Sequence, residues 1–373
     1  MRAVGIILAG GNNNRMKELT HKRAVAAMPI AGSYRSIDFA LSNMTNSHIQ
    51  KVAVLTQYNA RSLNEHLNSS KWWNFGRKQG GLYVFTPTIT NDNGYWYRGT
   101  ADAIYQNMDF LKKSHEPYVV IASGDAVYKM DYSKVLQYHI DKKADVTVVC
   151  KEMDPSDDVS RFGTIRMDDD MRITEFEEKP MVTKSNMIST GIYVIRRRLL
   201  IDLIEHAAEE ERFDFVNDVL IRYKNLKKIY GYKIDHYWSN IATVDAYYKT
   251  NMDFLKPEVR NYFFKQDPEI YSKVSDLPPA KYNPGASVKN SLVGSGSIIN
   301  GTVENSVLFR DVFVGNNCVI KNSVILNDVY LGDNTHIENC IVESRDTIRA
   351  NSYYCGEEGE VKIVVEKNER YVL

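Results

Sequence analysis

Short apolar runs alternate with amphipathic segments through the first 255 residues of the chain. The apolar runs are rich in β-branched residues, as in Val4–Leu8, Val52–Thr56, Tyr118–Ala122 and Asp145–Cys150. Such runs are typical of strands that are covered on both faces. The segments between them carry apolar residues at helical spacing, as in Ile37–Asn46, Ser62–Leu67, Ala101–Lys112 and Asp131–Lys142. The alternation predicts an α/β fold with an open, mostly parallel sheet.

Further along the chain the hydrophobic period changes to six residues. Apolar side chains recur at Val307, Phe313, Val319, Ile325, Leu331 and Ile337, with Asn, Gly, Asp and Ser at many positions between them. This period predicts a parallel β-helix built from hexapeptide repeats. Hexapeptide β-helices often belong to acyltransferases. Here His336 is the one candidate histidine, and we expect it at a solvent-facing corner, which favours packing and oligomerisation as the role of this domain.

A proline-rich stretch separates the two patterns. Five of the ten prolines lie between Pro257 and Pro284, where no clear periodicity is present. A chain of 373 residues is long enough for two domains with separate cores. We therefore predict a first domain over 1–255, a linker over 256–285 and a β-helix domain over 286–373.

Composition excludes several classes of function. The 47 basic residues balance the 47 acidic ones, so nothing points to nucleic acid or an anionic membrane as a partner. No apolar run approaches the roughly 18 residues of a membrane span, and the first run is better explained as a buried strand than as a signal peptide. The cysteines form no C-x-x-C pair and indicate reduced thiols in a cytoplasmic protein. They are Cys150, Cys318, Cys340 and Cys355.

Two polar loops directly follow predicted strands, at the sheet edge where ligands bind. The first, LAGGNNNR, places Gly10 and Gly11 where backbone N–H groups could cradle phosphate, and Arg15 suits a bidentate phosphate contact. Asn13 and Asn14 preserve the backbone shape but add carbamoyl groups where phosphate oxygens would approach. The alternative for this loop is a plain polar turn.

The second loop, SGDAVY, offers Asp125 as a ligand for Mg²⁺ or as a helix cap. Asp131 looks more like a cap. In WYRGTADAIYQN, Thr100 or Asp102 would cap the following helix. Lys179, in FEEKP, would be a solvated surface lysine in most proteins.

Taken together, these motifs resemble those of the bacterial ADP-glucose pyrophosphorylase (glucose-1-phosphate adenylyltransferase) family. The motifs LAGG…R, RSIDFALSNMTNS, LTQYNARSLNEH, WYRGTADAIYQN, SGDAVYKMDY, FEEKP and STGIYV occur in the family's order over nearly the whole chain. The resemblance implies a Rossmann-like nucleotidyltransferase domain, a left-handed parallel β-helix and a tetramer that acts in glycogen or starch-like glucan synthesis. Members of the family convert ATP and glucose 1-phosphate to ADP-glucose and pyrophosphate.

The resemblance also implies roles for individual residues. Arg15 and Asp125 correspond to catalytic positions, and Asp125 also to a Mg²⁺ ligand. The nucleotide side corresponds to Leu8, Gly10, Gly11, Gln57, Tyr97, Gly99 and Asp102. The sugar-phosphate side corresponds to Glu178, Lys179, Ser189 and Gly191.

Several positions depart from the family pattern. Val25 replaces a lysine that neutralises phosphate charge, and Asn240 replaces a second metal-binding aspartate. Asn13 and Asn14 replace Gly-Thr in the loop, and Ser33 replaces an activator-binding lysine. These changes resemble the regulatory, D-type subunit of the family. They imply weak Mg²⁺ binding, impaired catalysis and assembly with a catalytic homologous subunit in a heterotetramer, with glucose 1-phosphate and possibly ATP as ligands.

Two other hypotheses remain open at this stage. The chain could be an active adenylyltransferase in which Asp214 or Asp218 replaces the missing carboxylate. It could instead be a sugar-phosphate sensor or an oligomerisation scaffold that performs no transfer chemistry.

Overall fold

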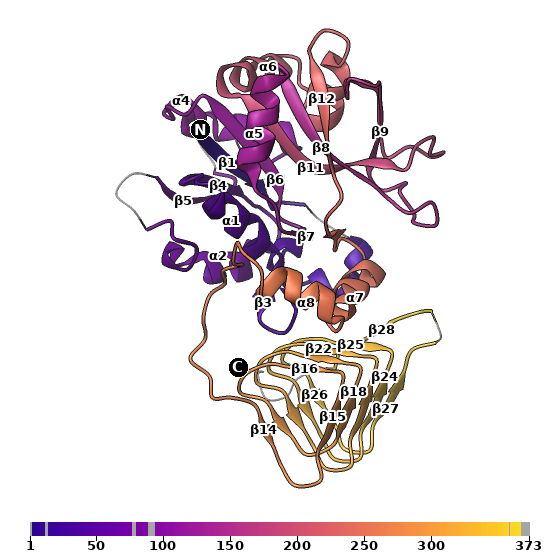
Figure 1. Ribbon diagram of the computed structural model, residues 1–373. Coiled ribbons are helices and arrows are strands. Elements are labelled where there is room, and N and C mark those ends of the chain that lie inside the picture. Colours follow the sequence, from indigo (N-terminus) through magenta and orange to yellow (C-terminus); the bar gives the residue numbers. More distant parts are fainter. Residues whose placement is uncertain (1, 12–13, 77–79, 89–93, 358, 367–373) are drawn as a thin grey trace.

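The computed structural model describes the whole chain except residues 1, 12–13, 77–79, 89–93, 358 and 367–373. It consists of an α/β domain and a C-terminal β-helix, with two helices of the α/β domain lying against the β-helix (Figure 1). Among the described helices, none has the length and apolar character needed to cross a bilayer.

The centre of the α/β domain is a mostly parallel sheet in the order β12-β8-β11-β6-β1-β4-β5. Only β11 (Met187–Arg196) runs against the others. The parallel strands are β1 (Ala3–Leu8), β4 (Lys51–Leu55), β5 (Gly81–Phe85), β6 (Tyr118–Ser123), β8 (Val146–Glu152) and β12 (Ile229–Ile234). All the predicted strands are confirmed and belong to this parallel set, which explains why their sequences are apolar throughout.

Helices cover both faces of this sheet. On one face α1 (Ser36–Asn46), α2 (Ala60–Leu67) and α5 (Tyr132–Asp141) share one apolar core with the strands. On the other face α3 (Thr100–Gln106), α4 (Met108–Lys112) and α6 (Arg197–Glu209) share a second core. The predicted helices are confirmed, and Asp131 caps α5 by accepting a hydrogen bond from Ser133 N at 2.9 Å.

The segment predicted as one helix over Ala101–Lys112 is two helices. The break falls at Asn107, whose backbone leaves the helical region and whose Nδ2 donates to the Ala103 carbonyl and to the Tyr97 hydroxyl, both at 2.9 Å. An asparagine side chain that binds nearby groups in this way competes with the helical hydrogen-bond pattern. The apolar periodicity does not report such a contact.

Smaller elements surround the carboxyl end of the sheet. They are η1 (Asn14–Thr20), η2 (Val25–Ala27), β2 (Pro29–Ile30), β3 (Tyr34–Arg35), η3 (Ser70–Trp73), β7 (Ala126–Tyr128), η4 (Phe215–Ile221) and β13 (Trp238–Asn240). A hairpin of β9 (Gly163–Met167) and β10 (Ile173–Glu178) extends from β11 to the side of the domain (Figure 1). Four of these elements, namely η1, η2, η4 and β13, contribute residues to the candidate site.

The stretch expected to be a linker over 256–285 begins with a helix. After α7 (Val244–Asp253), α8 (Pro257–Phe264) buries Phe263 completely, and its ring packs edge to face with that of Phe39, with 5.4 Å between the ring centres. Lys129 Nζ donates to the Tyr262 carbonyl at 2.8 Å. Only the rest of the stretch is extended, and it runs to the first strand of the β-helix, β14 (Lys281–Tyr282) (Figure 1).

The C-terminal domain consists of three parallel five-stranded sheets, as expected for a left-handed hexapeptide β-helix. One sheet contains β14, β17 (Ile298–Ile299), β20 (Phe313–Val314), β23 (Tyr330–Leu331) and β26 (Thr347–Ile348). The second contains β15 (Ser287–Lys289), β18 (Thr302–Glu304), β21 (Val319–Lys321), β24 (His336–Glu338) and β27 (Tyr353–Cys355). The third contains β16 (Leu292–Val293), β19 (Val307–Leu308), β22 (Val324–Ile325), β25 (Cys340–Val342) and β28 (Lys362–Val364).

The uninterrupted six-residue register predicted from the sequence is wrong in detail. Interior side chains follow at Leu308, Val314, Ile320, Ile325, Leu331, Ile337 and Val342, all fully buried. One corner of each coil is therefore a residue shorter, and equivalent residues are 17 apart. Val307, Phe313 and Val319 each precede an interior position. His336, expected at a corner, instead begins β24 and stacks on Tyr353.

The outer face of the third sheet joins the two domains. Val307, Val324 and Ile341 are buried in an apolar cluster with Phe254 and Phe263 of the α/β domain. At the edge of this contact the Tyr248 hydroxyl donates to the Asn322 carbonyl at 2.6 Å. Apolar residues on both faces of this sheet explain why its strands carry pairs of apolar residues.

Candidate functional site: the cleft at the sheet edge

A cleft of about 820 Å³ opens at the carboxyl ends of β1, β4 and β6, where the sheet topology predicts a ligand site. Twelve of the predicted site positions line it: Leu8, Gly10, Gly11, Arg15, Val25, Gln57, Tyr97, Gly99, Asp125, Lys179, Gly191 and Asn240. The other three, Asp102, Glu178 and Ser189, adjoin lining residues without lining the cleft themselves. The fold thus brings together motifs from most of the α/β domain.

The glycine loop follows β1 directly. Gly124 N donates to the Leu8 carbonyl at 2.9 Å, which ties this loop to the loop of Asp125. Gly10 and Gly11 line the cleft, and Asn14 and Arg15 line it from the start of η1. Asn13 lies outside the described residues. The loop therefore presents little side-chain bulk near the strand and a guanidinium beyond it, as a phosphate-binding loop requires.

On the nucleotide side, Gln57 and Tyr97 hold two loops together. Tyr97 N donates to Gln57 Oε1 at 2.9 Å, and Gln57 Nε2 donates to the Tyr97 carbonyl at 3.2 Å. Beside them Gly99 approaches the Phe213 carbonyl so closely that a Cβ at position 99 would lie 2.3 Å from its oxygen. Both polar atoms of the Gln57 amide are bound to the Tyr97 backbone, so this side chain fixes the position of the Tyr97 loop.

The caps expected for α3 are different in the structure. Gly99 occupies the N-cap position, whereas Asp102 accepts hydrogen bonds from Arg98 N at 2.8 Å and from its guanidinium at 3.2 Å. Thr100 Oγ1 accepts from Phe215 N at 3.0 Å. Close packing of Gly99 against Phe213 leaves no room for a side chain at the N-cap position. The two residues predicted as caps, Thr100 and Asp102, bind neighbouring backbone N–H groups instead.

Asp125, Asn240 and Val25 all line the cleft, and we call the part of the lining that they form the cleft centre. β13 pairs with β7 so that Asn240 lies opposite Ala126, and Ile241 N donates to the Asp125 carbonyl at 3.0 Å. Asn240 Oδ1 accepts from Ala242 N at 3.0 Å, and an oxygen of Asp125 accepts from the Ser123 hydroxyl. Val25, only 8% exposed, presents an apolar side chain. The centre therefore has one carboxylate.

This set of donors does not fit a resident Mg²⁺ ion. The described residues contain no cluster of three or more His, Cys, Asp or Glu side chains able to hold a metal. Asp125 and Asn240 could each offer an oxygen to a metal ion, but each already accepts a hydrogen bond from the protein. Mg²⁺ prefers anionic oxygens in near-octahedral geometry, and a single carboxylate supplies little of that.

The sugar-phosphate motifs border the cleft on the side of the β9–β10 hairpin. Lys179 Nζ lies 3.1 Å from Glu178 Oε1. Burial raises the pKa of Glu178, although Lys179 opposes the shift. Ser189 Oγ is 3.2 Å from the hydroxyl of Tyr193, which lines the cleft. Gly191 has a φ of 75°, in the left-handed region, and this residue lets β11 bulge beside Ser123.

Sequence reasoning missed several lining residues. Arg161 and Phe162 precede β9, and Arg98 lies over the Phe213 ring at 3.8 Å. Tyr58 also lines the cleft, and its ring stacks at 5.8 Å on that of Trp96, which is not a lining residue. No spacing rule in the sequence identifies Arg161. It reaches the cleft because β9 pairs with β10, and that pairing brings the residues before β9 next to Lys179.

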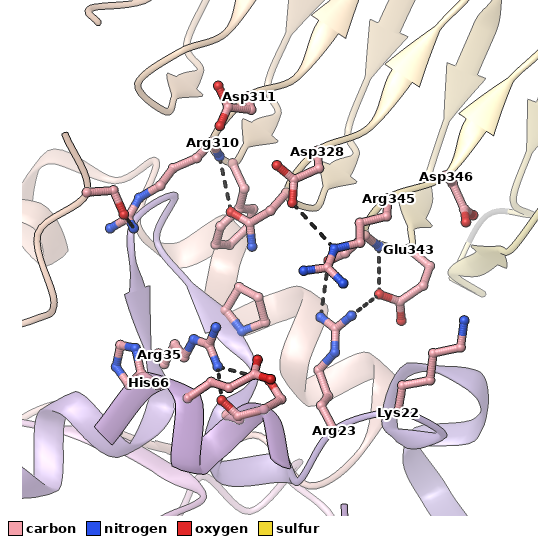
Figure 2. Close-up of a pocket in the computed structure, with 18 of the residues that line it drawn as sticks. Lys22, Arg23, Arg35, His66, Arg310, Asp311, Asp328, Glu343, Arg345 and Asp346 are labelled. Atoms are coloured by element: carbon pink, nitrogen blue, oxygen red, sulfur yellow. Dashed lines mark hydrogen bonds and ion pairs between the residues drawn. The ribbon is translucent and has the colours of Figure 1, made fainter. Parts of the chain in front are cut away.

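A second, larger cavity of about 1320 Å³ lies between the two domains (Figure 2). Arg23 from the α/β domain forms an ion pair with Glu343 of the β-helix, and Arg345 Nε lies 3.8 Å from Asp328. Arg310 donates to the Ser33 carbonyl at 2.6 Å, and burial lowers the pKa of Arg35 to about 10. The cavity thus collects positive charge from both domains, part of it neutralised by acidic residues of the β-helix.

The fold and the position of the cleft are those expected of the nucleotidyl transferase family. The nucleotidyl transferase family model matches residues 4–257, and the model of the GlmU-like, C-terminal hexapeptide family matches residues 278–360. Three relatives named glucose-1-phosphate adenylyltransferase come from Clostridium novyi (strain NT), Thermosipho melanesiensis and Geobacillus stearothermophilus. They are 41%, 40% and 39% identical over 85–86% of this chain and over 84%, 77% and 83% of their own lengths. The chain belongs to the glucose-1-phosphate adenylyltransferase family.

Proposed function

We propose that this chain is a catalytically impaired, regulatory subunit of a glucose-1-phosphate adenylyltransferase that acts in glycogen biosynthesis. In this proposal it assembles with a catalytic homologous subunit in a cytoplasmic heterotetramer. The observation that carries the proposal is the composition of the cleft centre, where Val25 and Asn240 lie in the same cleft as Asp125. A cation and a carboxylate that the family pattern places there are replaced by an apolar side chain and an amide.

Charge neutralisation is the main task of an adenylyl-transfer site. The sugar phosphate oxygen attacks the α-phosphorus of ATP, and negative charge must be stabilised on the transferring phosphates. Loss of one such charge-stabilising donor typically costs about 3 kcal/mol of transition-state stabilisation. Val25 provides no charge, and among the described residues that line the cleft Asp125 supplies the only carboxylate to hold Mg²⁺. Both features support a low turnover by the chain alone.

The binding functions of the cleft are better preserved. Lys179 and Gly191 line the sugar-phosphate side, with Glu178 and Ser189 next to them. The glycine loop and the Gln57–Tyr97 pair keep the shape of the nucleotide side. We therefore propose glucose 1-phosphate as a ligand, and ATP as a possible second ligand of the same cleft.

A regulatory role is supported by segments that reach both cavities. Arg23 lines the interdomain cavity, and Val25 two residues later lines the cleft. Arg35 also lines the interdomain cavity, and the next residue, Ser36, donates through Oγ to the Gly124 carbonyl at 2.9 Å, beside Asp125. A shift of the β-helix would therefore act on the cleft through two short, buried connections.

The alternative of an active enzyme with a replacement carboxylate is less well supported. Asp214 caps η4 by accepting from Asn217 N at 2.7 Å, and Asp218 accepts from the backbone N–H groups of Phe213 and Asp214. Neither carboxylate lines the cleft. Their hydrogen bonds keep both at the start of η4, away from the position of Asn240 in β13.

The proposal is tested by assaying ADP-glucose synthesis by the pure chain, by a catalytic homologue and by their mixture. We expect little activity from the pure chain and a higher activity, or a changed effector response, in the mixture than in the homologue alone. The Val25→Lys/Asn240→Asp double variant should gain at least about tenfold in turnover, because it restores one cation and one carboxylate. Full activity of the unmodified chain, abolished by Asp125→Ala, would establish the active-enzyme alternative instead.

A further inference from the structure

Arg161 occupies an unusual place in the cleft. It lies just before β9 and lines the cleft with Phe162, whose ring its guanidinium approaches to 4.7 Å. Phe162 in turn packs edge-on against Trp238, with 5.6 Å between the ring centres. Trp238 begins β13, and Asn240 ends it. These packed side chains therefore hold Arg161 next to the strand that carries Asn240.

Arg161 also connects the two halves of the cleft. Lys179 N donates to the Phe162 carbonyl at 3.1 Å, so the backbone at Arg161 and Phe162 lies beside the sugar-phosphate lysine. On the other side, Arg161 Nη1 donates to Thr243 Oγ1 at 3.3 Å, in the loop that follows Asn240. The guanidinium therefore lies between the sugar-phosphate side of the cleft and the strand that carries Asn240.

The electrostatic surroundings of this guanidinium suit an anion. Burial lowers the pKa of Arg161, while Asp158 and Asp125 oppose the shift and Arg15 adds to it. Within the described part of the chain, Thr243 is its only hydrogen-bond partner, and no carboxylate forms an ion pair with it. A half-buried guanidinium with five donors is costly to leave with a single neutral partner. The charged residues that line the cleft are Arg15, Arg98, Asp125, Arg161 and Lys179. Of the cations among them, Arg98 and Lys179 already have carboxylate partners, Asp102 and Glu178.

We propose that Arg161 binds the phosphate group of the ligand in this cleft and supplies positive charge where Val25 supplies none. The ligand class is a phosphate ester, either the sugar phosphate or the nucleotide, since both contain the group that a guanidinium recognises in bidentate fashion. The inference rests on the proposed function in one respect, namely that the cleft still accepts phosphorylated ligands. It assigns a binding role to a residue that lies outside the family motifs found in the sequence.

The test is isothermal titration of the full chain with glucose 1-phosphate and, separately, with ATP. Arg161→Gln removes the charge and keeps a polar side chain, and Arg161→Lys keeps the charge without the planar fork. Arg166→Gln is the matched control, because Arg166 is an exposed arginine of the same hairpin that lies 3.5 Å from Glu175 and does not line the cleft. Thermal melting of each variant shows whether it is folded.

We expect Arg161→Gln to raise the Kd of at least one ligand by about tenfold or more, as loss of a charge-assisted phosphate contact does. Arg161→Lys should have a smaller effect and Arg166→Gln none. A weaker affinity for glucose 1-phosphate alone would place the contact at the sugar phosphate, and a weaker affinity for ATP alone would place it at the nucleotide.

Unchanged affinities in a folded Arg161→Gln variant would overturn the inference. It would also fail if the unmodified chain bound neither ligand. The proposed function is judged by a different measurement, namely whether the chain changes the activity of a catalytic homologue, so the two can fail independently.

Discussion

At the scale of single residues, Asp346 shows how strongly the domain contact perturbs a side chain. It lies in the β-helix wall of the interdomain cavity, is only 4% exposed and accepts one hydrogen bond, from Glu366 N at 2.9 Å. Burial, together with nearby Glu343 and Glu366, raises the pKa of Asp346 to about 7, although Lys22 opposes the shift. The folded protein therefore holds the proton of this carboxyl group far better than the unfolded chain does.

This pKa predicts the sign of a pH effect on stability. An unfolded aspartate has a pKa of about 3.9, so Asp346 favours the folded state at low pH and loses that contribution as the pH rises from about 4 to about 7. Asp346→Asn keeps an acceptor for Glu366 N and cannot ionise. Relative to wild type, this variant should gain at least about 1 kcal/mol in unfolding free energy between pH 5 and pH 8, measured with urea. Asp169→Asn, an exposed control, should show no such trend; a pH-independent difference for Asp346→Asn would contradict the assignment.

Elements of secondary structure are stabilised by repetition in the β-helix. Asn305, Asn322 and Asn339 occupy equivalent corners, each with a positive φ, and Asn305 Nδ2 donates to Asn322 Oδ1 at 2.6 Å. Asparagine tolerates this left-handed conformation better than other residues with a side chain. The asparagines at these corners therefore have a structural role, and other polar residues would fit the left-handed conformation less well.

The second sheet of the β-helix carries an ordered row of charges on its outer face. Lys289, Glu304, Lys321 and Glu338 are in register on neighbouring strands, so opposite charges alternate along the row. Neighbouring strands are about 4.8 Å apart, close enough for such side chains to interact.

Lys321→Glu should therefore destabilise the β-helix, because three carboxylates would then follow one another in the row. We expect a loss of about 1 kcal/mol of unfolding free energy in urea denaturation, which shrinks in about 0.5 M salt. Lys321→Gln, which removes the attraction without adding repulsion, should lose less. Equal losses for the two variants at low salt would argue that the row has no electrostatic role.

In the whole molecule, the two domains are held together by an apolar contact and by the buried ion pair of Arg23 and Glu343. The apolar contact joins the outer face of the third β-helix sheet to α7, α8 and their neighbours. Beside it Arg23 forms an ion pair with Glu343 and donates to Ser344 Oγ at 3.1 Å, and both charged side chains are less than 15% exposed (Figure 2). A charge in this position is stabilised mainly by its partner.

Arg23→Gln should destabilise the protein by about 3 kcal/mol, because it removes the cation paired with the buried carboxylate of Glu343. The Arg23→Gln/Glu343→Gln double variant should recover part of this loss. Urea denaturation of this variant, of both single variants, Arg23→Gln and Glu343→Gln, and of wild type gives the coupling energy. Arg61→Gln is the control, since the Arg61–Glu65 pair is exposed and its loss should change stability by less than about 1 kcal/mol. Strict additivity in the cycle would show that Arg23 and Glu343 do not act as a pair.

Much of this architecture could be predicted from the sequence, because local pattern reflects local structure. The buried parallel strands, the helices between them and the hexapeptide repeats all appear in the sequence as periodic apolar positions. The glycine loop and Asp125 were placed correctly at the sheet edge, since residues that follow parallel strands meet there. The shorter corner of each β-helix coil and the break at Asn107 were missed, because each depends on a specific side-chain or corner contact rather than on periodicity.

By itself, the sequence determined the fold class, the order of the domains and the candidate site residues, including Val25 and Asn240. Only the tertiary structure decided that Val25, Asp125 and Asn240 line one cleft, that Arg161 joins them beside Lys179, and that Arg23 meets Glu343 across the domain boundary. The physical reason is that these residues are far apart along the chain and meet only through strand pairing and domain packing. Neither leaves a periodic signal in the sequence.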